Sequence, residues 1–132
     1  MRKLTILLVL VMAISLAACG GSSSGGSGGA ADAAAGEKVF NEKLIGAQPG
    51  CVTCHSFEPG VKIVGPSLAG IATTAATREA GKSAEDYLIE SITKPDAYTV
   101  DGFDAGTMPV GLATELSEQQ VKDLVAFLMT HK

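Results

Sequence analysis

Apolar residues recur at helical spacing close to the C-terminus. They occupy positions i, i+3, i+4 and i+7 of one helix face: Val121, Leu124, Val125 and Leu128. Ser117 and the polar residues 118–120 directly precede this run, which is typical of a helix N-terminus. The pattern therefore predicts an amphipathic C-terminal helix.

A second amphipathic segment begins near Asp32. Gly36, Phe40 and Leu44 recur every four residues on one face, and Asp32 is a residue type that caps helices. We predict a helix from Asp32 through about Leu44. Because glycine inside a helix costs about 1 kcal/mol relative to alanine, Gly36 is either tolerated or allows a close helix crossing.

The middle of the chain carries weaker helix signals. Ser83 and Asp86 form a pair like a capping box, and Pro95 lies just beyond the predicted end of a helix over residues 83–93. Residues 73–81 are a candidate for a further short helix.

Two stretches rich in glycine and proline separate these segments, a turn at residues 46–50 and a loop at residues 56–70. No strand-like alternation and no internal repeat is visible in the sequence. We therefore predict an all-α fold of three to five helices with long irregular loops.

The N-terminus has the features of an export signal. Arg2 and Lys3 precede an apolar run over residues 4–16, which is shorter than the roughly 20 residues of a membrane span. The string Leu16-Ala17-Ala18-Cys19 resembles a bacterial lipobox, and this resemblance implies removal of residues 1–18 and lipidation of Cys19. A retained anchor helix and a plain secretory peptide are the alternatives, and all three readings export the protein.

The segment after Cys19 is composed of glycine and serine up to Gly29, followed by two alanines. This composition predicts a flexible tether over residues 19–31, with an r.m.s. reach of roughly 19 Å. The globular domain is then expected over residues 32–132.

Composition and charge limit the function classes. The 132-residue chain has 10 basic and 14 acidic side chains, and loss of Arg2 and Lys3 with the signal leaves 8 against 14. An acidic domain is poorly suited to nucleic acid, and charge-steered partners should present basic surface. With few aromatic residues and no tryptophan, the core would be thin without a bound apolar group.

Residues 51–55 read Cys-Val-Thr-Cys-His, the attachment signature of a c-type haem. The spacing lets the sulfurs of Cys51 and Cys54 form thioethers with the two vinyl groups of one porphyrin. His55 then supplies the proximal ligand of the iron. The lipid would take Cys19 and the haem would take Cys51 and Cys54, which accounts for all three cysteines of the chain.

This string has three other interpretations. A thioredoxin-like redox motif needs a βαβ pattern, which is not visible around it. A structural zinc site needs four ligands, and only the distant His131 could complete the set. A chance match is the third.

Met108 is the predicted second axial ligand. It lies in Gly106-Thr107-Met108-Pro109 between two predicted helices, and Pro109 favours an extended backbone at Met108. Two other candidates fit less well. His131 at the end of a helix is typical of a solvated histidine that interacts with the helix dipole, and Met129 is typical of a core methionine.

With these residues in this order, the segment from about residue 32 to residue 132 resembles a bacterial class I monohaem cytochrome c. The resemblance implies a small cytochrome c fold around one covalent haem c. It also implies that Gly36 and Phe40 lie where the N-terminal helix crosses the C-terminal one, near Leu124, Phe127 and Leu128.

The resemblance also concerns Gly65-Pro66, which is similar to the loop whose proline carbonyl accepts a hydrogen bond from the proximal histidine. Pro66 could otherwise be a simple turn residue. Some members have a tryptophan near a haem propionate and this chain has none. Tyr98 is a candidate for that place, or else a surface or core tyrosine.

A Met/His pair raises the reduction potential and leaves no open position on the iron. We therefore expect an electron carrier and not an enzyme, tethered by lipid at the outer face of the cytoplasmic membrane. It would pass single electrons between a redox protein donor and acceptor on the periplasmic or extracellular side.

Two alternatives remain. The domain could be a fixed relay subunit of a larger membrane complex, such as a quinol-oxidising complex, a nitric oxide reductase or a terminal oxidase. A peroxidase or gas sensor would require Met108 to leave the iron.

Overall fold

The computed structural model describes residues 29–132. Residues 1–18, Cys19 and the predicted tether up to residue 28 lie outside the described residues. The elements in chain order are helix α2 (Ala33–Asn41), strands β1 (Leu44–Ile45) and β2 (Gln48–Pro49), and helices α3 (Cys51–Cys54), α4 (Ile71–Arg78), α5 (Ala84–Thr93), α6 (Leu112–Glu115) and α7 (Glu118–Leu128). The predicted all-α class is confirmed, with four longer helices and two single turns in this part of the chain.

Side-chain caps set the starts of three helices as the sequence predicted. The Asp32 carboxylate accepts hydrogen bonds from the first turn of α2. Ser83 accepts from the backbone N–H of Asp86 at the start of α5. Ser117 and Gln120 form a reciprocal capping box at the start of α7.

The predicted end of the first helix was wrong. The helix ends at Asn41, because Glu42 adopts an extended backbone and the chain enters a small antiparallel hairpin. Leu44 pairs with Pro49 in this hairpin, and the N–H of Gly50 donates to the carbonyl of Lys43. Strands of two residues are too short to leave an alternating pattern in the sequence.

The short helix predicted over residues 73–81 is present as α4, but it begins two residues earlier than predicted. It begins at Ile71 and ends at Arg78, three residues before the positive φ of Gly81. The loop predicted for residues 56–70 contains no helix or strand. The single turns α3 and α6 were not predicted as helices, since four residues carry too little periodicity to be recognised.

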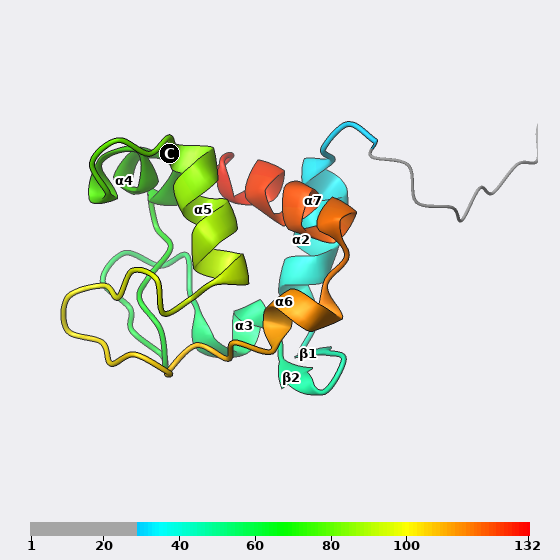
Figure 1. The fold of residues 1–132 in the computed structure, drawn as a ribbon, viewed down its shortest axis with the longest axis horizontal. Helices are drawn as coiled ribbons and strands as arrows, with labels where there is room; N and C mark the ends of the chain where they lie inside the picture. The colour runs from blue at the N-terminus through cyan, green and yellow to red at the C-terminus, as the bar shows by residue number, and fades with distance from the viewer. Residues whose placement is uncertain (1–28) are drawn as a thin grey trace, which may run out of the picture.

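The main packing contact joins helices α2 and α7, which lie against each other in Figure 1. At the crossing, a Cβ placed on Gly36 would lie 1.9 Å from the backbone oxygen of Asp123. Only glycine allows the two backbones to come this close. Gly36 is therefore a packing residue and not merely a tolerated one.

A buried carboxylate reinforces this crossing. Asp123 is 7% exposed, and its Oδ1 accepts hydrogen bonds from the backbone N–H of Asp32 at 2.9 Å and from Gln119 Nε2 at 2.8 Å. The Gln119 amide also donates to the carbonyl of Ala30. These contacts tie the start of the described chain to α7.

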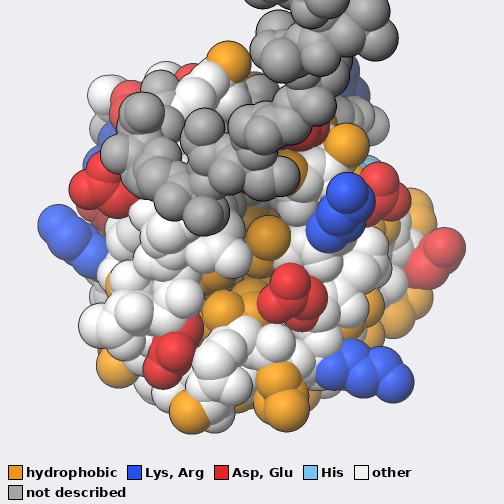
Figure 2. All heavy atoms as spheres, turned by 90° about the vertical axis from the view of Figure 1, so that its right-hand side faces the viewer, with side chains coloured by type: hydrophobic (Ala, Val, Ile, Leu, Met, Phe, Trp, Pro, Cys, Tyr) orange, Lys and Arg blue, Asp and Glu red, His pale blue; other side chains and the backbone are white. Residues whose placement is uncertain are grey.

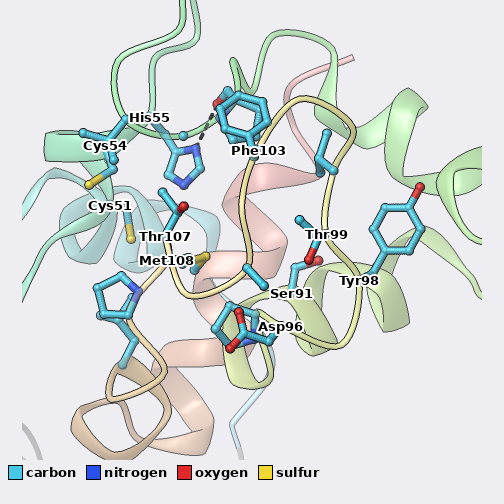
Figure 3. A pocket seen from close by; sticks show the side chains of 18 of the residues that line it. Cys51, Cys54, His55, Ser91, Asp96, Tyr98, Thr99, Phe103, Thr107 and Met108 are labelled. Carbon is cyan, nitrogen blue, oxygen red and sulfur yellow. Dashed lines mark hydrogen bonds between the residues drawn. The ribbon is translucent and has the colours of Figure 1, made fainter.

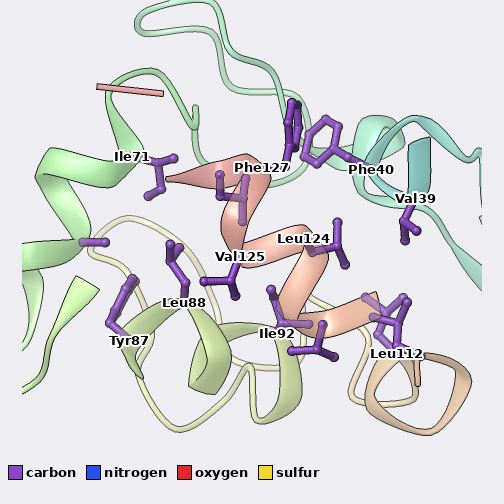
Figure 4. Close-up of a cluster of buried hydrophobic side chains, with 14 of the residues drawn as sticks. Val39, Phe40, Ile71, Tyr87, Leu88, Ile92, Leu112, Leu124, Val125 and Phe127 are labelled. Carbon is purple, nitrogen blue, oxygen red and sulfur yellow. The ribbon is translucent and has the colours of Figure 1, made fainter. Parts of the chain in front are cut away.

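The hydrophobic core surrounds α7 (Figure 4). Leu124 is 1% exposed at its centre, with Phe40 of α2 on one side and Leu88 of α5 on the other. Phe40 and Phe127 pack with their ring centroids 5.5 Å apart. The crossing that the resemblance implied near these residues is thus present.

An aromatic cluster extends from this core to the loop after residue 55. Phe57 contacts both Phe40 and Phe127, and the ring of His131 stacks on Phe57 with a centroid distance of 3.7 Å. His131 is half-buried, so the expectation of a solvated histidine was wrong. The C-terminus instead packs against the loop that follows the Cys-x-x-Cys-His string.

Basic and acidic side chains both lie on the face that carries α2 and the hairpin. Figure 2 shows basic and acidic side chains interspersed over the uncovered part of this face. Among residues 29–132, no helix has the length and apolar character needed to cross a bilayer.

The Gly36 crossing yields a prediction about stability. Gly36→Ala should lower the free energy of unfolding by about 2 kcal/mol or more, because the new methyl group meets backbone that cannot rotate away. Glu37→Ala, an exposed change on the same helix, should change it by less than about 0.5 kcal/mol. Denaturant unfolding of both variants measures the difference, and equal effects would contradict this account of the crossing.

Candidate cofactor-binding site

A large pocket lies between α3, α5 and the loop that joins α5 to α6 (Figure 3). It contains about 960 Å³ of space not filled by protein atoms, including its open mouth. All five residues predicted to bind the cofactor line it: Cys51, Cys54, His55, Pro66 and Met108.

The two cysteines come from one short helical turn. Cys51 and Cys54 begin and end α3, so they are three residues apart and face the same side. Both thiols are free of disulfide bonds. Burial raises the pKa of the Cys51 thiol to about 11, which keeps it protonated at neutral pH before any bond to a cofactor forms.

His55 follows α3 directly, and one hydrogen bond fixes its ring. Its Nδ1 lies 2.9 Å from the carbonyl oxygen of Pro66, shown as the dashed line in Figure 3. A carbonyl only accepts, so Nδ1 carries the proton and Nε2 keeps its lone pair. Burial lowers the pKa of His55, with the Pro66 hydrogen bond opposing that shift. The ring is thus held in the neutral form that binds metals.

The backbone beside the ring leaves no spare room. A Cβ on Gly65 would lie 2.5 Å from His55 Cε1 and 2.9 Å from Nδ1. The N–H groups of Val64 and Gly65 both donate to the carbonyl of Cys54. The loop is therefore folded back onto the Cys-x-x-Cys-His string, and Gly65-Pro66 acts as a ring clamp and not only as a turn.

Met108 reaches the same pocket from a different part of the chain. It is half-buried, lies in the loop between α5 and α6, and packs against the hydrophobic core. Two hydrogen bonds brace this loop, from Gly106 N–H to Asp96 Oδ1 at 2.7 Å and from Thr107 Oγ1 to Asp104 O at 2.7 Å. Met129 packs against the core and is not a lining residue.

The pocket lining also contains polar side chains. Tyr98, the candidate from the sequence, lines it together with Arg78 and Tyr87. Arg78 Nη1 lies 3.5 Å from the Tyr87 hydroxyl, and the rings of Tyr87 and Tyr98 pack edge to face. Guanidinium and phenol groups are suited to carboxylates. Sequence reasoning missed Arg78 and Tyr87, although Arg78 is the sole arginine after residue 2.

These residues fit a c-type haem. The donor set combines two thiols three residues apart, a neutral imidazole with a free Nε2 and a thioether, all lining one largely apolar pocket. The zinc interpretation needed His131, which does not line the pocket. No group of three or more metal-binding side chains of the cysteine, histidine and carboxylate kind occurs within residues 29–132.

The chain was compared with models of protein families and with curated proteins. A family model described as cytochrome c matches residues 33–132, which includes every pocket residue discussed above. No curated protein matches the chain.

The clamp on His55 can be tested with one methyl group. Gly65→Ala should displace the ring, lower the free energy of unfolding by about 1–3 kcal/mol, and speed exchange of the His55 Nδ1 proton about tenfold or more as its hydrogen bond weakens. Pro59→Ala, an exposed change in the same loop, should alter neither quantity. Proton NMR of the reduced protein measures the exchange, and an unchanged Nδ1 signal in Gly65→Ala would contradict the clamp.

Proposed function

The chain belongs to the cytochrome c family, and from this premise we propose that it is a membrane-tethered carrier of single electrons between redox proteins. Members of this family are electron-transfer haem proteins with covalently bound haem c. The haem supplies reversible gain and loss of one electron at its iron. The finer assignments of ligands, tether and partners are our proposals.

One observation carries the proposal: His55 and Met108, 53 positions apart, line the same pocket as Cys51 and Cys54. We assign Cys51 and Cys54 to the two thioether bonds of a single haem, and His55 Nε2 and Met108 to the iron. With both His55 and Met108 bound to the iron, small molecules such as oxygen or peroxide would find no vacant position on it. This ligation favours electron transfer over catalysis on a bound substrate.

The surrounding residues support the same role. The Pro66 carbonyl holds the imidazole in one tautomer and one orientation, which limits movement of the ligand when the charge on the iron changes. Ile71, Leu88 and Leu112 are buried side chains of the lining, and they limit access of water. A thioether is a soft ligand that favours the reduced iron and raises the potential.

Replacing the thioether provides the test. In Met108→Leu the reduction potential should fall by about 0.1 V or more, within the roughly 0.8 V that axial ligands span. The reduced variant should also bind carbon monoxide rapidly, because one position on the iron is open. Redox titration and stopped-flow absorbance measure the two effects.

Met129→Leu is the matched control, since it makes the same substitution in a methionine packed against the core. It should leave the potential and the carbon monoxide resistance unchanged. If wild-type protein binds carbon monoxide as fast as Met108→Leu, Met108 is not the ligand. A gas-binding or enzymatic role would then replace the proposed electron transfer.

The proposed tether rests on residues 1–31. We infer that residues 1–18 are removed, that Cys19 is lipidated, and that residues 19–31 link the lipid to the domain. The described chain supports a domain boundary near residue 30, since Ala30 and Asp32 are hydrogen-bonded to α7. A domain tethered in this way searches a small volume above the outer face of the cytoplasmic membrane, where a donor and an acceptor with basic surfaces suit its negative charge.

Mass spectrometry of membrane-extracted protein tests the tether. Wild-type protein should begin at an acylated Cys19, whereas Cys19→Ser should remain unacylated and uncut, because cleavage at a lipobox requires the cysteine. Ser22→Ala should be processed like wild type. A Cys19→Ser protein that is cut and released normally would indicate a plain secretory peptide, and wild type that retains residues 1–18 would indicate an anchor helix.

A further inference from the structure

Two loops line the pocket from separate parts of the chain. The loop of residues 56–66 carries the carbonyl that orients His55, and it is tied to α3 by hydrogen bonds from Val64 and Gly65 to Cys54. The loop of residues 95–109 carries Met108 and is braced internally by Asp96 and Asp104. The hydrogen bonds of each loop are therefore local to its own stretch of chain, whereas Phe57 and Met108 pack against the hydrophobic core.

A single polar contact joins these loops. Lys62 Nζ lies 5.0 Å from the centroid of the Phe103 ring, within the range of a cation–π interaction. The same nitrogen lies 3.8 Å from where a Cβ on Gly102 would be. No hydrogen bond or ion pair found within residues 29–132 connects residues 56–66 to residues 95–109.

The position of Phe103 gives this contact its importance. Phe103 is half-buried and lines the pocket five residues before Met108 (Figure 3). The N–H of Phe103 donates to the carbonyl of Val100, so the ring is carried on a tight turn. Glycines at 102 and 106, both with positive φ, flank it. Besides the packing of Tyr98 and Met108 against the core, the hydrogen bonds of this loop are local, so a contact at Phe103 can influence where Met108 lies.

We propose that Lys62 and Phe103 form a clasp that positions Met108. The exposed ammonium of Lys62 holds the Phe103 ring against the loop of residues 56–66. The loop of residues 95–109 is thereby kept closed, with the Met108 thioether at the iron. Lys62 is thus a positioning residue, since it acts on the ligand through Phe103 and does not touch it. The inference rests on the proposed function, because it requires Met108 to be a ligand.

Loss of the clasp should increase the fraction of molecules in which the loop is open. An exposed cation–π contact corresponds to about a twofold to fivefold change in such an equilibrium. Added imidazole competes with the thioether for ferric iron only when Met108 has left. Its apparent affinity therefore reports the open fraction directly.

The experiment titrates imidazole into the full-length, haem-loaded ferric protein. Lys62→Gln should bind imidazole about twofold to fivefold more tightly than wild type. Lys62→Arg should restore the wild-type affinity, because arginine also interacts with aromatic rings. Lys122→Gln, which removes an exposed positive charge from α7, should have no effect. Equal affinities in Lys62→Gln and wild type would overturn the clasp.

A second measurement separates the clasp from a general charge effect. In a Phe103→Leu background, Lys62→Gln should add little further change, since its partner ring is gone. An undiminished effect there would show that Lys62 acts through space on the iron, and the clasp would be rejected.

The two proposals can fail separately. Wild-type ferric protein should show the far-red charge-transfer band of thioether-bound iron. Absence of the band would contradict ligation by Met108, whereas a normal band with no effect of Lys62→Gln would contradict the clasp alone.

Discussion

The contact between the backbones of α2 and α7 at Gly36 is the constraint on which the rest of the structure depends. A side chain at this position would collide with the Asp123 carbonyl, so the two helices fit together only with glycine. Their crossing brings Phe40 against Phe127, and both rings contact Phe57. Because Phe57 lies two residues after His55, the helix crossing fixes the segment that carries the proposed proximal ligand.

The helices provide a rigid frame, whereas the pocket itself is made mainly by loops. His55, Pro66 and Met108 all lie outside helices and strands, and their positions depend on a few hydrogen bonds and close glycine contacts. A wide apolar pocket is costly to leave exposed to water. A covalently attached apolar cofactor removes this cost, which explains how a small domain without tryptophan can form a stable core.

Sequence alone predicted the features that arise from local interactions. The caps at Asp32, Ser83 and Ser117 were found because a capping side chain and its partner N–H are two or three residues apart. The hairpin after Asn41 was missed, since Gly50 and Lys43 pair without any periodic signal. Arg78 and Tyr87 were missed because their place in the pocket depends on how α4 packs on α5. Motifs and a family resemblance identified Cys51, Cys54, His55, Pro66 and Met108, and the roles of these residues in binding haem stay predictions.

The hydrogen bonds from Ala30 and Asp32 to α7 determine how the domain responds to mechanical load. Tension applied through residue 29 would reach Gln119 and Asp123 first. The packing of α2 against α7 would then resist it. The segments that carry His55 and Met108 lie outside this load path, so pulling on the N-terminal end would leave the proposed iron ligands undisturbed until the helix pair separates.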